Sequence, residues 1–489
     1  MERAGGRELH LYDTLTRQVQ PVKVSNGKQV RIYCCGPTVY RDAHVGNLRT
    51  FLLSDLVTRT LKFNGFEVDL VQNITDVGHM TEDFEEDKII AQSKSERRDP
   101  FEIARDYEAR FHNDCAALEI TKARAYPRAS ECIELMIDFI SKLLEIGVAY
   151  QGIDGSIYFD AKKAIDYGGL SGNKLEALKP GHRYEYEEEG AKRFHADWAL
   201  WKAAGNRKEM IWQTPWGAGF PGWHIECSAM SLKYLNNHVD LHIGGIDLRF
   251  PHHENERAQS NPIAGGEAVS LWLHGEHLLF EGRKMSKSSG NVVLIKDLIE
   301  RGIDPLALRF CFMENRYRSQ MDLSWDSLKA AHNFLGRLRK TYTSALTSEP
   351  MMTERVTDFI DSIVSDFRND LDTPKAMLKL RTLERLEISD GERRAIFEKL
   401  ELLLGLDLLS RRPKRPLPEA ASKLLEARIA ARAAKDFALS DSLRDQLAKL
   451  GVLVQDTANG QEWSWLVDFS ERAKAINSQI IPPSNKNVP

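Results

Sequence analysis

The pattern of apolar and polar positions divides the chain into a mixed first part and a helical last part. Residues 30–35 form a short β-branched run that ends at a Gly-Pro turn, and residues 48–64 carry apolar side chains at a helical period. A second strand is predicted over 67–71. Strand, turn, helix and strand within about forty residues are typical of a βαβ unit, which indicates a parallel sheet and an α/β fold.

The middle of the chain interrupts this pattern. It predicts helices at 101–119 and 128–147, a short strand near 156–159 and a polar loop at 179–192. The sheet is expected to resume with a strand at 239–243 that ends in two glycines. We therefore interpret the intervening block as an insertion between two halves of one Rossmann-like, doubly wound parallel sheet.

The last third is predicted to be helical. Residues 325–409 indicate an antiparallel bundle, a basic Pro-rich linker follows, and one more helical segment runs from 419 to 450. A short strand with two tryptophans and a polar tail complete the chain. The expected boundaries are 1–98 and 206–270 for the two halves of the sheet domain, 99–205 for the insertion, 271–324 for a connecting region, 325–410 for the bundle, 411–418 for the linker, 419–475 for a C-terminal module and 476–489 for a disordered tail.

Composition excludes several classes of protein. A hydrophobic fraction of 42% and a charged fraction of 28% are globular values, and the sequence has no apolar run long enough for a membrane span. Six cysteines are too few for a disulfide scaffold, and the first residues lack a signal peptide's apolar core, so a cytoplasmic location is expected. A net charge of −4 argues against a globally basic nucleic-acid binder but leaves room for a local basic surface.

A candidate phosphate-binding motif follows the first strand. His44, Gly46 and Asn47 lie where a helix begins at the carboxyl end of that strand. A helix N-terminus offers free N–H groups and the positive end of its dipole to phosphate, and doubly wound sheets bind ligands at this edge. The same residues are equally compatible with a helix cap and a structural histidine.

A candidate charge clamp lies much later in the chain. Lys284 and Lys287 are three residues apart in the loop Lys-Met-Ser-Lys-Ser-Ser-Gly-Asn. Two lysines on such a loop are suited to stabilising the charge on a leaving pyrophosphate. A solvated basic loop is the alternative interpretation.

Four dispersed residues form a candidate metal site. Cys35 ends the first strand, and Cys227 lies in Pro-Gly-Trp-His-Ile-Glu-Cys. His252 and Glu256 are four residues apart and would share one helix face. Two thiolates, an imidazole and a carboxylate make a plausible tetrahedral zinc shell, although such dispersed ligands are easy to imagine.

The two phosphate motifs together resemble the paired signatures of class I aminoacyl-tRNA synthetases. Closer similarity is to the cysteinyl-tRNA synthetase family, in Cys-Gly-x-Thr-Val-Tyr at 35–40, Pro-Gly-Trp-His-Ile-Glu-Cys-Ser-Ala-Met at 221–230 and Phe-Pro-His-His-Glu-Asn-Glu at 250–256. Asp-Trp-Ala-Leu-Trp-Lys at 197–202 and Tyr-Arg-Ser-Gln at 317–320 agree. The chain departs from the pattern at Asn47, where the class signature has histidine, and at 78–86, which looks inserted.

The resemblance implies a role for each candidate. His44, Gly46, Asn47, Asp247 and Lys287 would bind ATP, with His44, Asn47, Lys284 and Lys287 acting on the phosphates. Gly36, Thr38, Thr75 and Trp223 would surround the amino acid. Cys35, Cys227, His252 and Glu256 would hold one zinc ion, with the neighbouring Cys34 outside the shell.

The implied reaction joins L-cysteine to tRNA(Cys) through a cysteinyl-adenylate, with ATP and Mg²⁺. An apolar pocket separates side chains as similar as those of cysteine and serine by only about 1–3 kcal/mol, whereas zinc coordinates a thiolate far better than a hydroxyl. We therefore interpret the zinc as a recognition element, with no editing domain needed, and expect a monomer without membrane contact.

The C-terminal module is the expected anticodon reader. Arg428, Arg432 and Lys435 follow one another at i, i+4 and i+7, which predicts a basic stripe on one helix face, and Trp463 is suited to stacking on an unpaired base. A solvated helix face and a small apolar core are the corresponding structural alternatives.

Two other functions compete with tRNA charging. One is a ligase of the same fold that joins cysteine to an amino sugar; such relatives lack the anticodon-binding end that this chain retains. The other is a non-catalytic amino-acid sensor or tRNA-binding module, which would have no use for a pyrophosphate clamp.

Overall fold

A four-stranded parallel sheet forms the centre of the molecule in this computed structural model, with the strand order β11-β10-β3-β4. The strands are β3 (Gln29–Cys34), β4 (Glu67–Gln72), β10 (Leu241–Gly245) and β11 (Trp272–Gly275). Every residue of β10 and β11 is buried, as expected for a parallel sheet covered on both faces. The structure describes residues 8–24, 27, 29–78, 80, 87–178, 191–285, 291–409, 419–450, 452–457 and 460–465.

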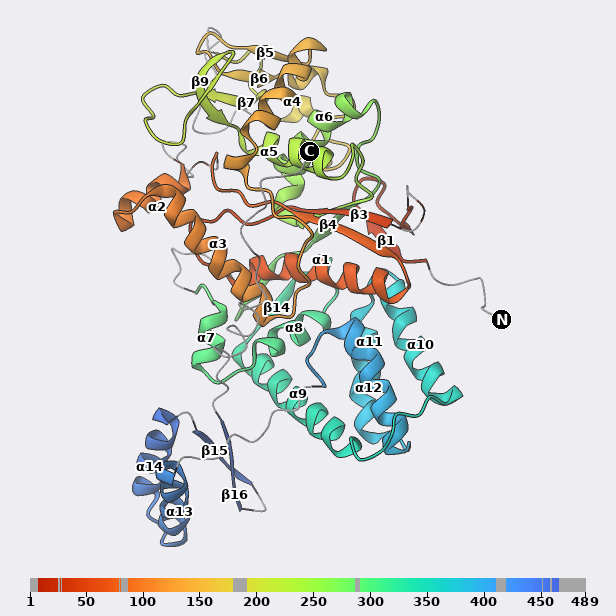
Figure 1. Cartoon of the computed structure of the whole chain (residues 1–489), viewed down its shortest axis with the longest axis vertical. Helices are drawn as coiled ribbons and strands as arrows, with labels where there is room; N and C mark the ends of the chain where they lie inside the picture. The colour runs from red at the N-terminus through yellow and green to blue at the C-terminus, as the bar shows by residue number, and fades with distance from the viewer. Residues whose placement is uncertain are drawn as a thin grey trace.

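The predicted βαβ unit is confirmed. Helix α1 (Val45–Phe63) connects β3 to β4 and begins with a reciprocal cap, in which His44 Nδ1 accepts from the Asn47 backbone N–H and Asn47 Oδ1 accepts from the His44 N–H. The cap places the candidate phosphate motif at the first turn of α1. In Figure 1 the sheet lies between α1 on one side and α5 (Trp223–Tyr234) with α6 (Glu254–Ala264) on the other.

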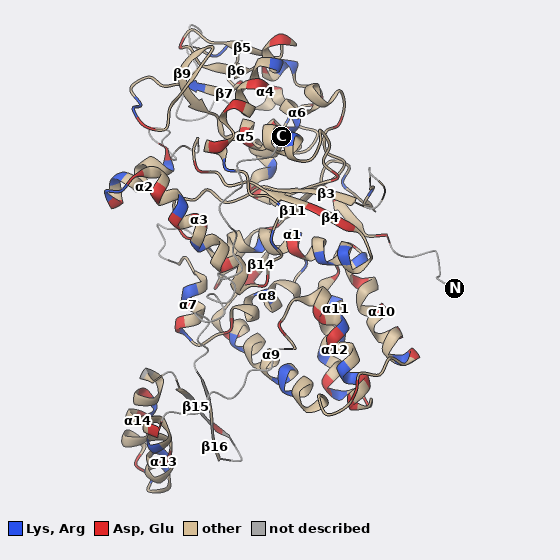
Figure 2. Ribbon diagram, viewed as in Figure 1, with Lys and Arg blue, Asp and Glu red and all other residues tan. Residues whose placement is uncertain are grey.

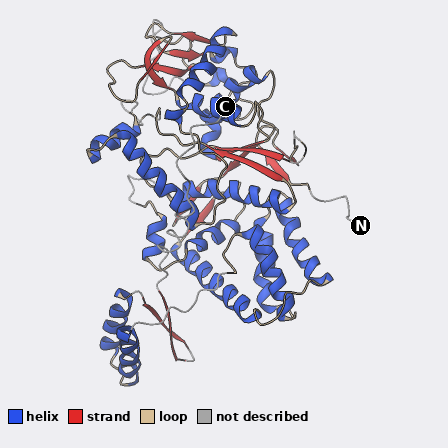
Figure 3. Ribbon diagram, viewed as in Figure 1, coloured by secondary structure: helices blue, strands red, loops and turns tan. Residues whose placement is uncertain are grey.

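The block between β4 and β10 contains more β-structure than its sequence predicts. Before α5, its described residues form three α-helices and a five-stranded antiparallel sheet in the order β5-β6-β7-β9-β8, which extends beyond the expected end at residue 205 (Figure 3). Three of the strands have only three residues, too few for a clear alternating pattern. The elements are α2 (Lys88–Glu96), α3 (Pro100–Ala117), α4 (Ile133–Glu145), β5 (Ala149–Gln151), β6 (Ile157–Phe159), β7 (Trp198–Ala203), β8 (Trp212–Thr214) and β9 (Gly217–Pro221).

Short elements join the sheet to a helical bundle, which confirms the predicted helices at 325–409. Figure 1 shows the bundle beside α1, and α12 packs against both α1 and α9. The elements are β12 (Leu278–Phe280), β13 (Arg283–Lys284), α7 (Ile295–Glu300), α8 (Pro305–Met313), β14 (Met321–Leu323), α9 (Trp325–Ala345), α10 (Glu354–Arg368), α11 (Thr373–Thr382) and α12 (Asp390–Leu404). Single helical turns occur at Ala129–Glu131, Ala161–Lys163, Leu175–Ala177, Ile246–Leu248, Arg249–His253 and Leu383–Arg385.

An N-terminal hairpin extends the sheet region at its β11 edge. Strands β1 (His10–Asp13) and β2 (Gln18–Pro21) pair antiparallel. Backbone and carboxylate hydrogen bonds join the hairpin to β11, from the Thr14 N–H to the Trp272 carbonyl and from the Trp272 N–H to Asp13 Oδ1. The hairpin therefore lies beside the edge strand β11 and is joined to its first residue.

The C-terminal module corrects one prediction. The expected single helix over 419–450 is two helices, α13 (Glu419–Ala433) and α14 (Phe437–Lys449), followed by a hairpin of β15 (Val452–Thr457) and β16 (Gly460–Trp465). The break occurs at Lys435, whose φ is 60°, and the Asp436 side chain caps α14 by accepting from the Leu439 N–H. The module has its own small core, against which Trp463 is partly buried.

The predicted loop at 179–192, the linker at 411–418 and the tail at 476–489 lie wholly or largely outside the described residues. Among the described helices, none is long and apolar enough to cross a membrane. Figure 2 shows basic and acidic side chains mixed along the bundle helices, which agrees with the small net charge.

Candidate functional site

The four predicted metal ligands come together in a buried cluster at the carboxyl end of the sheet. Cys35 follows β3, and Cys227 lies in α5. His252 lies in the helical turn Arg249–His253 before α6, and Glu256 lies in the first turn of α6. The Cys35 Sγ atom is 3.8 Å from Cys227 Sγ and 3.6 Å from Glu256 Oε1, and His252 Nε2 is 3.0 Å from the same carboxylate oxygen. No side chain of the four is more than 4% exposed.

Two further histidines enter the cluster that sequence reasoning missed. His242 on β10 and His253 place their Nε2 atoms 3.4 Å and 3.2 Å from Cys35 Sγ, so Cys35, His242, His253 and Glu256 form a second possible ligand group. Only their positions could have indicated that they belong to the cluster. His242 lies on the strand that pairs with the one before Cys35, and His253 directly follows His252.

The donor chemistry favours the first group for zinc. Only that group contains two thiols, the ligands zinc prefers, together with one imidazole and one carboxylate. The other ring nitrogen of His252, Nδ1, is 2.9 Å from His224 Nδ1, which leaves Nε2 facing the cluster. The residues present therefore fit a tetrahedral zinc ion.

Burial sets the protonation of this cluster. It raises the pKa of the Glu256 carboxyl and of the Cys35 thiol well above their ordinary values, and it lowers the pKa of His253 well below its own. Each of these three groups on its own therefore favours its neutral form. At Cys227, burial also raises the pKa of the thiol, but hydrogen bonds from Cys35 and His252 leave that pKa below its ordinary value. A divalent cation would compensate the buried negative charge of two thiolates and a carboxylate, which couples metal binding to proton release.

The two phosphate motifs, distant in sequence, are adjacent in the fold. A Cβ atom at Gly46 would lie 2.9 Å from the Met285 side chain, next to Lys284, and the Val45 N–H donates to the Val293 carbonyl. Lys284 is exposed on β13, whereas Lys287 lies outside the described residues. The loop that carries both lysines therefore begins and ends beside the first turn of α1.

His44 is arranged as a neutral hydrogen-bond donor. Burial, with a contribution from Arg41, lowers its pKa to about 4. Because Nδ1 accepts from the Asn47 N–H, the proton of the neutral ring is assigned to Nε2. The cap therefore coexists with a donor for phosphate, and the structural interpretation of this motif does not exclude the functional one.

The predicted amino-acid pocket rests on a buried polar chain. The Gly36 N–H donates to Asn73 Oδ1, Asn73 Nδ2 donates to Thr75 Oγ1, and Thr75 Oγ1 donates to Glu226 Oε2 at 3.0 Å. A Cβ atom at Gly36 would overlap the Asn73 carbonyl at 1.6 Å, so only glycine fits there. Sequence reasoning missed Asn73 and Glu226, because this hydrogen-bond chain connects Gly36 and Thr75 to a helix about 150 residues further along.

The remaining pocket residues lie around the same edge. Thr38 pairs with Thr75 in an isolated bridge, and the Trp223 ring lies 4.3 Å from the His252 ring, against the metal cluster. Asp247 is exposed in the turn after β10, and a Cβ atom at Gly245 would lie 2.4 Å from its Oδ1 atom. The structure thus brings together the residues predicted to surround the amino acid and, beside them, Asp247 of the predicted nucleotide site.

The segment predicted to be inserted at 78–86 lies largely outside the described residues, but both of its ends are held. The Gly78 N–H donates to Asp87 Oδ2, and Asp87 also caps α2. A Cβ atom at Gly78 would lie 2.9 Å from Glu226 Oε1, so the segment leaves the sheet directly beside the predicted amino-acid pocket.

The predicted basic stripe on the C-terminal helix is wrong for Arg428. Its side chain is fully buried and pairs with Asp456 on β15 through two hydrogen bonds of 2.9 Å, because the hairpin covers this face of α13. Arg432 is partly exposed and also reaches Asp456, at 3.1 Å, while Lys435 lies beyond the end of α13. Arg428 joins the helix to the hairpin and is not available to a phosphate.

Comparison with known proteins agrees with this geometry. Residues 21–333 match the family model described as the tRNA synthetases class I (C) catalytic domain, and residues 414–463 match the cysteinyl-tRNA ligase anticodon binding domain. A cysteine–tRNA ligase of Thermus thermophilus is 42% identical over 93% of this chain and 99% of its own length. A relative of the same name from Burkholderia lata is 41% identical over 93% and 96%.

Solved structures show the same fold at low sequence identity. A Mycobacterium tuberculosis methionyl-tRNA synthetase with methionyl-adenylate has a TM-score of 0.54 at 14% identity and covers 84% of this chain and 96% of its own. An Agrobacterium radiobacter LeuRS complexed with tRNA and LeuAMS has a TM-score of 0.58 at 11% identity, covering 78% and 84%.

The parallel sheet, the two adjacent phosphate motifs and the matched catalytic domain define a class I aminoacyl-tRNA synthetase. Within that class, the near full-length relatives and the matched anticodon binding domain are specific to cysteine–tRNA ligases. The chain belongs to the cysteine–tRNA ligase family.

Proposed function

We propose that the protein ligates L-cysteine to tRNA(Cys) through a cysteinyl-adenylate, consuming ATP as its Mg²⁺ complex. The observation that carries this proposal is the position of the thiol-rich cluster. It lies at the same edge of the sheet as the two adjacent phosphate motifs. A site selective for sulfur next to a site for a nucleotide is what activation of cysteine requires.

The first step is positioned by this chain's own groups. The cysteine carboxylate oxygen bonds to the α-phosphorus of ATP, the bond to the β-phosphate oxygen breaks, and pyrophosphate leaves. The His44 Nε2–H group and the first turn of α1 would donate to the phosphates, and Asn47 Nδ2 would do the same. Lys284 and Lys287 would stabilise the charge on the leaving pyrophosphate.

The second step transfers the amino acid. A ribose hydroxyl at the end of the tRNA bonds to the adenylate carbonyl carbon and loses its proton, and AMP leaves. The exposed Asp247 carboxylate would accept from the ribose of the adenylate, and the buried chain of Asn73, Thr75 and Glu226 would hold the wall of the amino-acid pocket. Trp223 would close that pocket against His252.

Selectivity for cysteine would come from the metal site. Zinc bound by Cys35, Cys227, His252 and Glu256 supplies a Lewis acid that prefers a thiolate to a hydroxyl. The neighbouring rings of His242 and His253 surround the same space and would leave little room for bulkier side chains. No editing domain is required on this account.

The C-terminal module would read the anticodon end. Arg432 and Lys435 remain candidate phosphate contacts and Trp463 a candidate stacking residue, whereas Arg428 holds the module together. All six cysteines are free thiols, which supports a reducing, cytoplasmic location. We propose a monomer, divided at the boundaries expected from the sequence except that the insertion extends to Pro221.

The test is a pair of assays on the full-length protein. Cysteine-dependent exchange of pyrophosphate into ATP should occur without tRNA, and charging of a tRNA(Cys) transcript should require it. Exchange without charging would favour the amino-sugar ligase, while the absence of both would leave only a sensor or binding module.

A further inference from the structure

Arg49 is a buried cation on α1 that the reaction described above does not use. It lies in the second turn of the helix and is 5% exposed. Its Nη1 atom donates to the backbone carbonyls of Glu276 and His277, and its Nη2 atom donates to those of Arg316 and Ser319, all at 2.8–2.9 Å. Burial lowers the pKa of Arg49 to about 10, which leaves the group charged at neutral pH.

The four carbonyls belong to two segments that lead into one small sheet. Residues 276–277 directly precede β12, and residues 316–319 end just before β14. Strand β12 is the central strand of the sheet β13-β12-β14, and its antiparallel neighbour β13 carries Lys284. Arg49 therefore joins the helix of the first phosphate motif to the sheet of the second.

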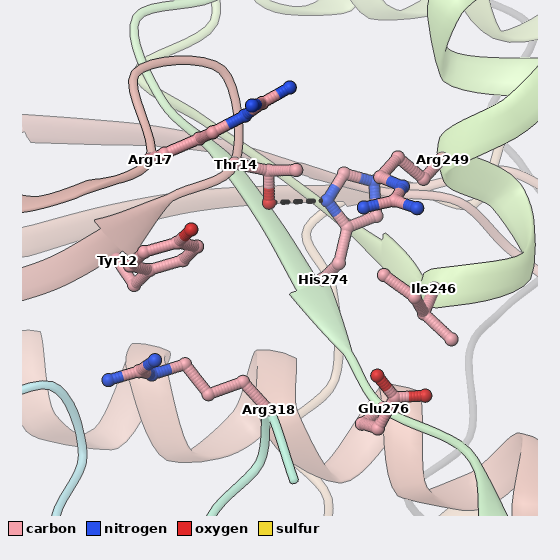
Figure 4. Close-up of a pocket in the computed structure, with 8 residues that line it drawn as sticks. All are labelled: Tyr12, Thr14, Arg17, Ile246, Arg249, His274, Glu276 and Arg318. Carbon is pink, nitrogen blue, oxygen red and sulfur yellow. Dashed lines mark hydrogen bonds between the residues drawn. The ribbon is translucent and has the colours of Figure 1, made fainter. Parts of the chain in front are cut away.

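The two segments also border a cavity. Glu276 and Arg318 line it together with side chains of the β1–β2 hairpin and of the turn after β10, and its volume is about 340 Å³ (Figure 4). The Glu276 N–H donates to the Tyr317 carbonyl, which joins the segments to each other. Because the cavity leaves part of both segments without packing, their position depends more strongly on the hydrogen bonds from Arg49.

The face of α1 that carries Arg49 also contacts the chain that follows β13. Val45 is four residues before Arg49 and lies on the same helix face, and its N–H donates to the Val293 carbonyl. At the next residue, Gly46, a Cβ atom would lie 2.9 Å from the Met285 side chain. A shift between α1 and β13 would therefore separate the phosphate donors at the start of α1 from Lys284.

A guanidinium group suits the task of holding these parts in register. Its planar fork presents donors in fixed directions, so four hydrogen bonds define the positions of two segments at once. An ammonium group has three donors on a flexible stem and cannot reproduce this pattern. Misplacing a group that acts on the substrate by about 1 Å can cost roughly 100-fold in rate.

We propose that Arg49 is a positioning residue for adenylate formation, which sets the distance between the phosphate donors at the start of α1 and Lys284 on β13. This inference rests on the proposed function, in which these groups act on one phosphate chain. It assigns a role in the reaction to a residue that neither phosphate motif includes.

A double-mutant cycle in ATP–pyrophosphate exchange tests the proposal on the full-length, zinc-loaded protein. Arg49→Lys should lower kcat about 100-fold and leave the KM for cysteine within about twofold. Lys284→Ala should also lower kcat about 100-fold. In the Lys284→Ala protein, Arg49→Lys should lower kcat by about tenfold or less, because one of the groups that Arg49 positions is already absent. Arg49→Gln, which also removes the buried charge, should show the same dependence on Lys284.

The cycle separates positioning from a merely structural role. If Arg49→Lys only reduced the fraction of folded protein, kcat would fall by the same factor with and without Lys284, and that result would overturn the proposal. Arg339→Lys is the matched control, because Arg339 on α9 also donates to two backbone carbonyls, those of Leu406 and Asp407, but within the bundle. It should leave kcat unchanged, and a loss as large as that of Arg49→Lys would also overturn the proposal. Absence of exchange in the wild type would instead overturn the proposed function.

Discussion

The buried cluster of candidate metal ligands and the C-terminal module show opposite relations between sequence spacing and structure. At the cluster, four residues from three separate segments meet within hydrogen-bonding distance. In the module, three basic residues on one predicted helix face do not form a common surface, because one of them is buried under a hairpin. A ligand at a strand end has its position fixed by the sheet, whereas the exposure of a helix face depends on what packs against it.

The largest effect is expected at the cluster. Cys227→Ser should remove most of the single zinc ion and lower cysteine-dependent exchange at least 100-fold, because a neutral hydroxyl replaces a thiolate ligand. Metal analysis of the purified protein and pyrophosphate exchange measure the two effects. Cys34→Ser is the matched control: Cys34 is equally buried but its Sγ points to the Cys35 carbonyl. Loss of zinc from Cys34→Ser would show that the wrong neighbour was chosen.

Lys287→Ala should lower kcat for adenylate formation about 100-fold and change the KM for cysteine little. A clamp on the leaving group acts in the transition state, and removing one such donor typically costs 10²–10³. Steady-state exchange kinetics separate the two constants. A rise confined to the KM for cysteine would contradict the role of this lysine.

Arg428→Ala should destabilise the C-terminal module by about 2 kcal/mol, because Asp456 would lose its buried partner. Charging should therefore fall while exchange is retained, and limited proteolysis should release the module. Arg432→Ala provides the contrast: it should leave the module folded and reduce the salt dependence of tRNA binding by about one unit of slope. If limited proteolysis of Arg428→Ala gives the same pattern as the wild type, Arg428 does not stabilise the module and its role does not differ from that of Arg432.

The smallest effect concerns pH. Because the folded-state pKa of His44 is about 4, the unfolded chain binds the extra proton as pH falls below about 6.5. Folding stability from this residue is therefore present above pH 6.5 and declines toward pH 4. Between pH 7 and about 5.5, the wild type should lose about 1 kcal/mol more than His44→Asn, which keeps a good helix cap. Urea unfolding at several pH values measures this loss. An equal fall in the free energy of unfolding for the two proteins would contradict a neutral His44.

Sequence reasoning predicted the part of the fold that local patterns specify. The β-branched run at 30–35 and the helical period at 48–64 are strong signals, and the motifs that start from them have the expected positions. Strands of three residues, such as β5 and β6, carry no readable alternation, so the insertion's sheet was not predicted. The break at Lys435 was also missed, because Ala-Lys-Asp has no helix-breaking residue.

The candidate site divides in the same way. Cys227 and the pair His252 and Glu256 were found because they lie in distinctive motifs. Asn73 and Glu226 were missed because their role depends on a hydrogen-bond chain that joins positions about 150 residues apart, Thr75 to Glu226. Arg17 and Arg249, distant in the sequence, line one cavity because the hairpin and the turn after β10 form a common wall.

We propose that the buried cluster and the two phosphate motifs form one site that activates cysteine. Its most direct test is ATP–pyrophosphate exchange by the zinc-loaded wild type, with cysteine and serine compared as substrates at equal concentration. We expect robust exchange with cysteine and at least 1,000-fold less with serine, since coordination by zinc discriminates beyond the 10- to 200-fold of an apolar pocket. Comparable exchange with serine, or none with cysteine, would contradict it.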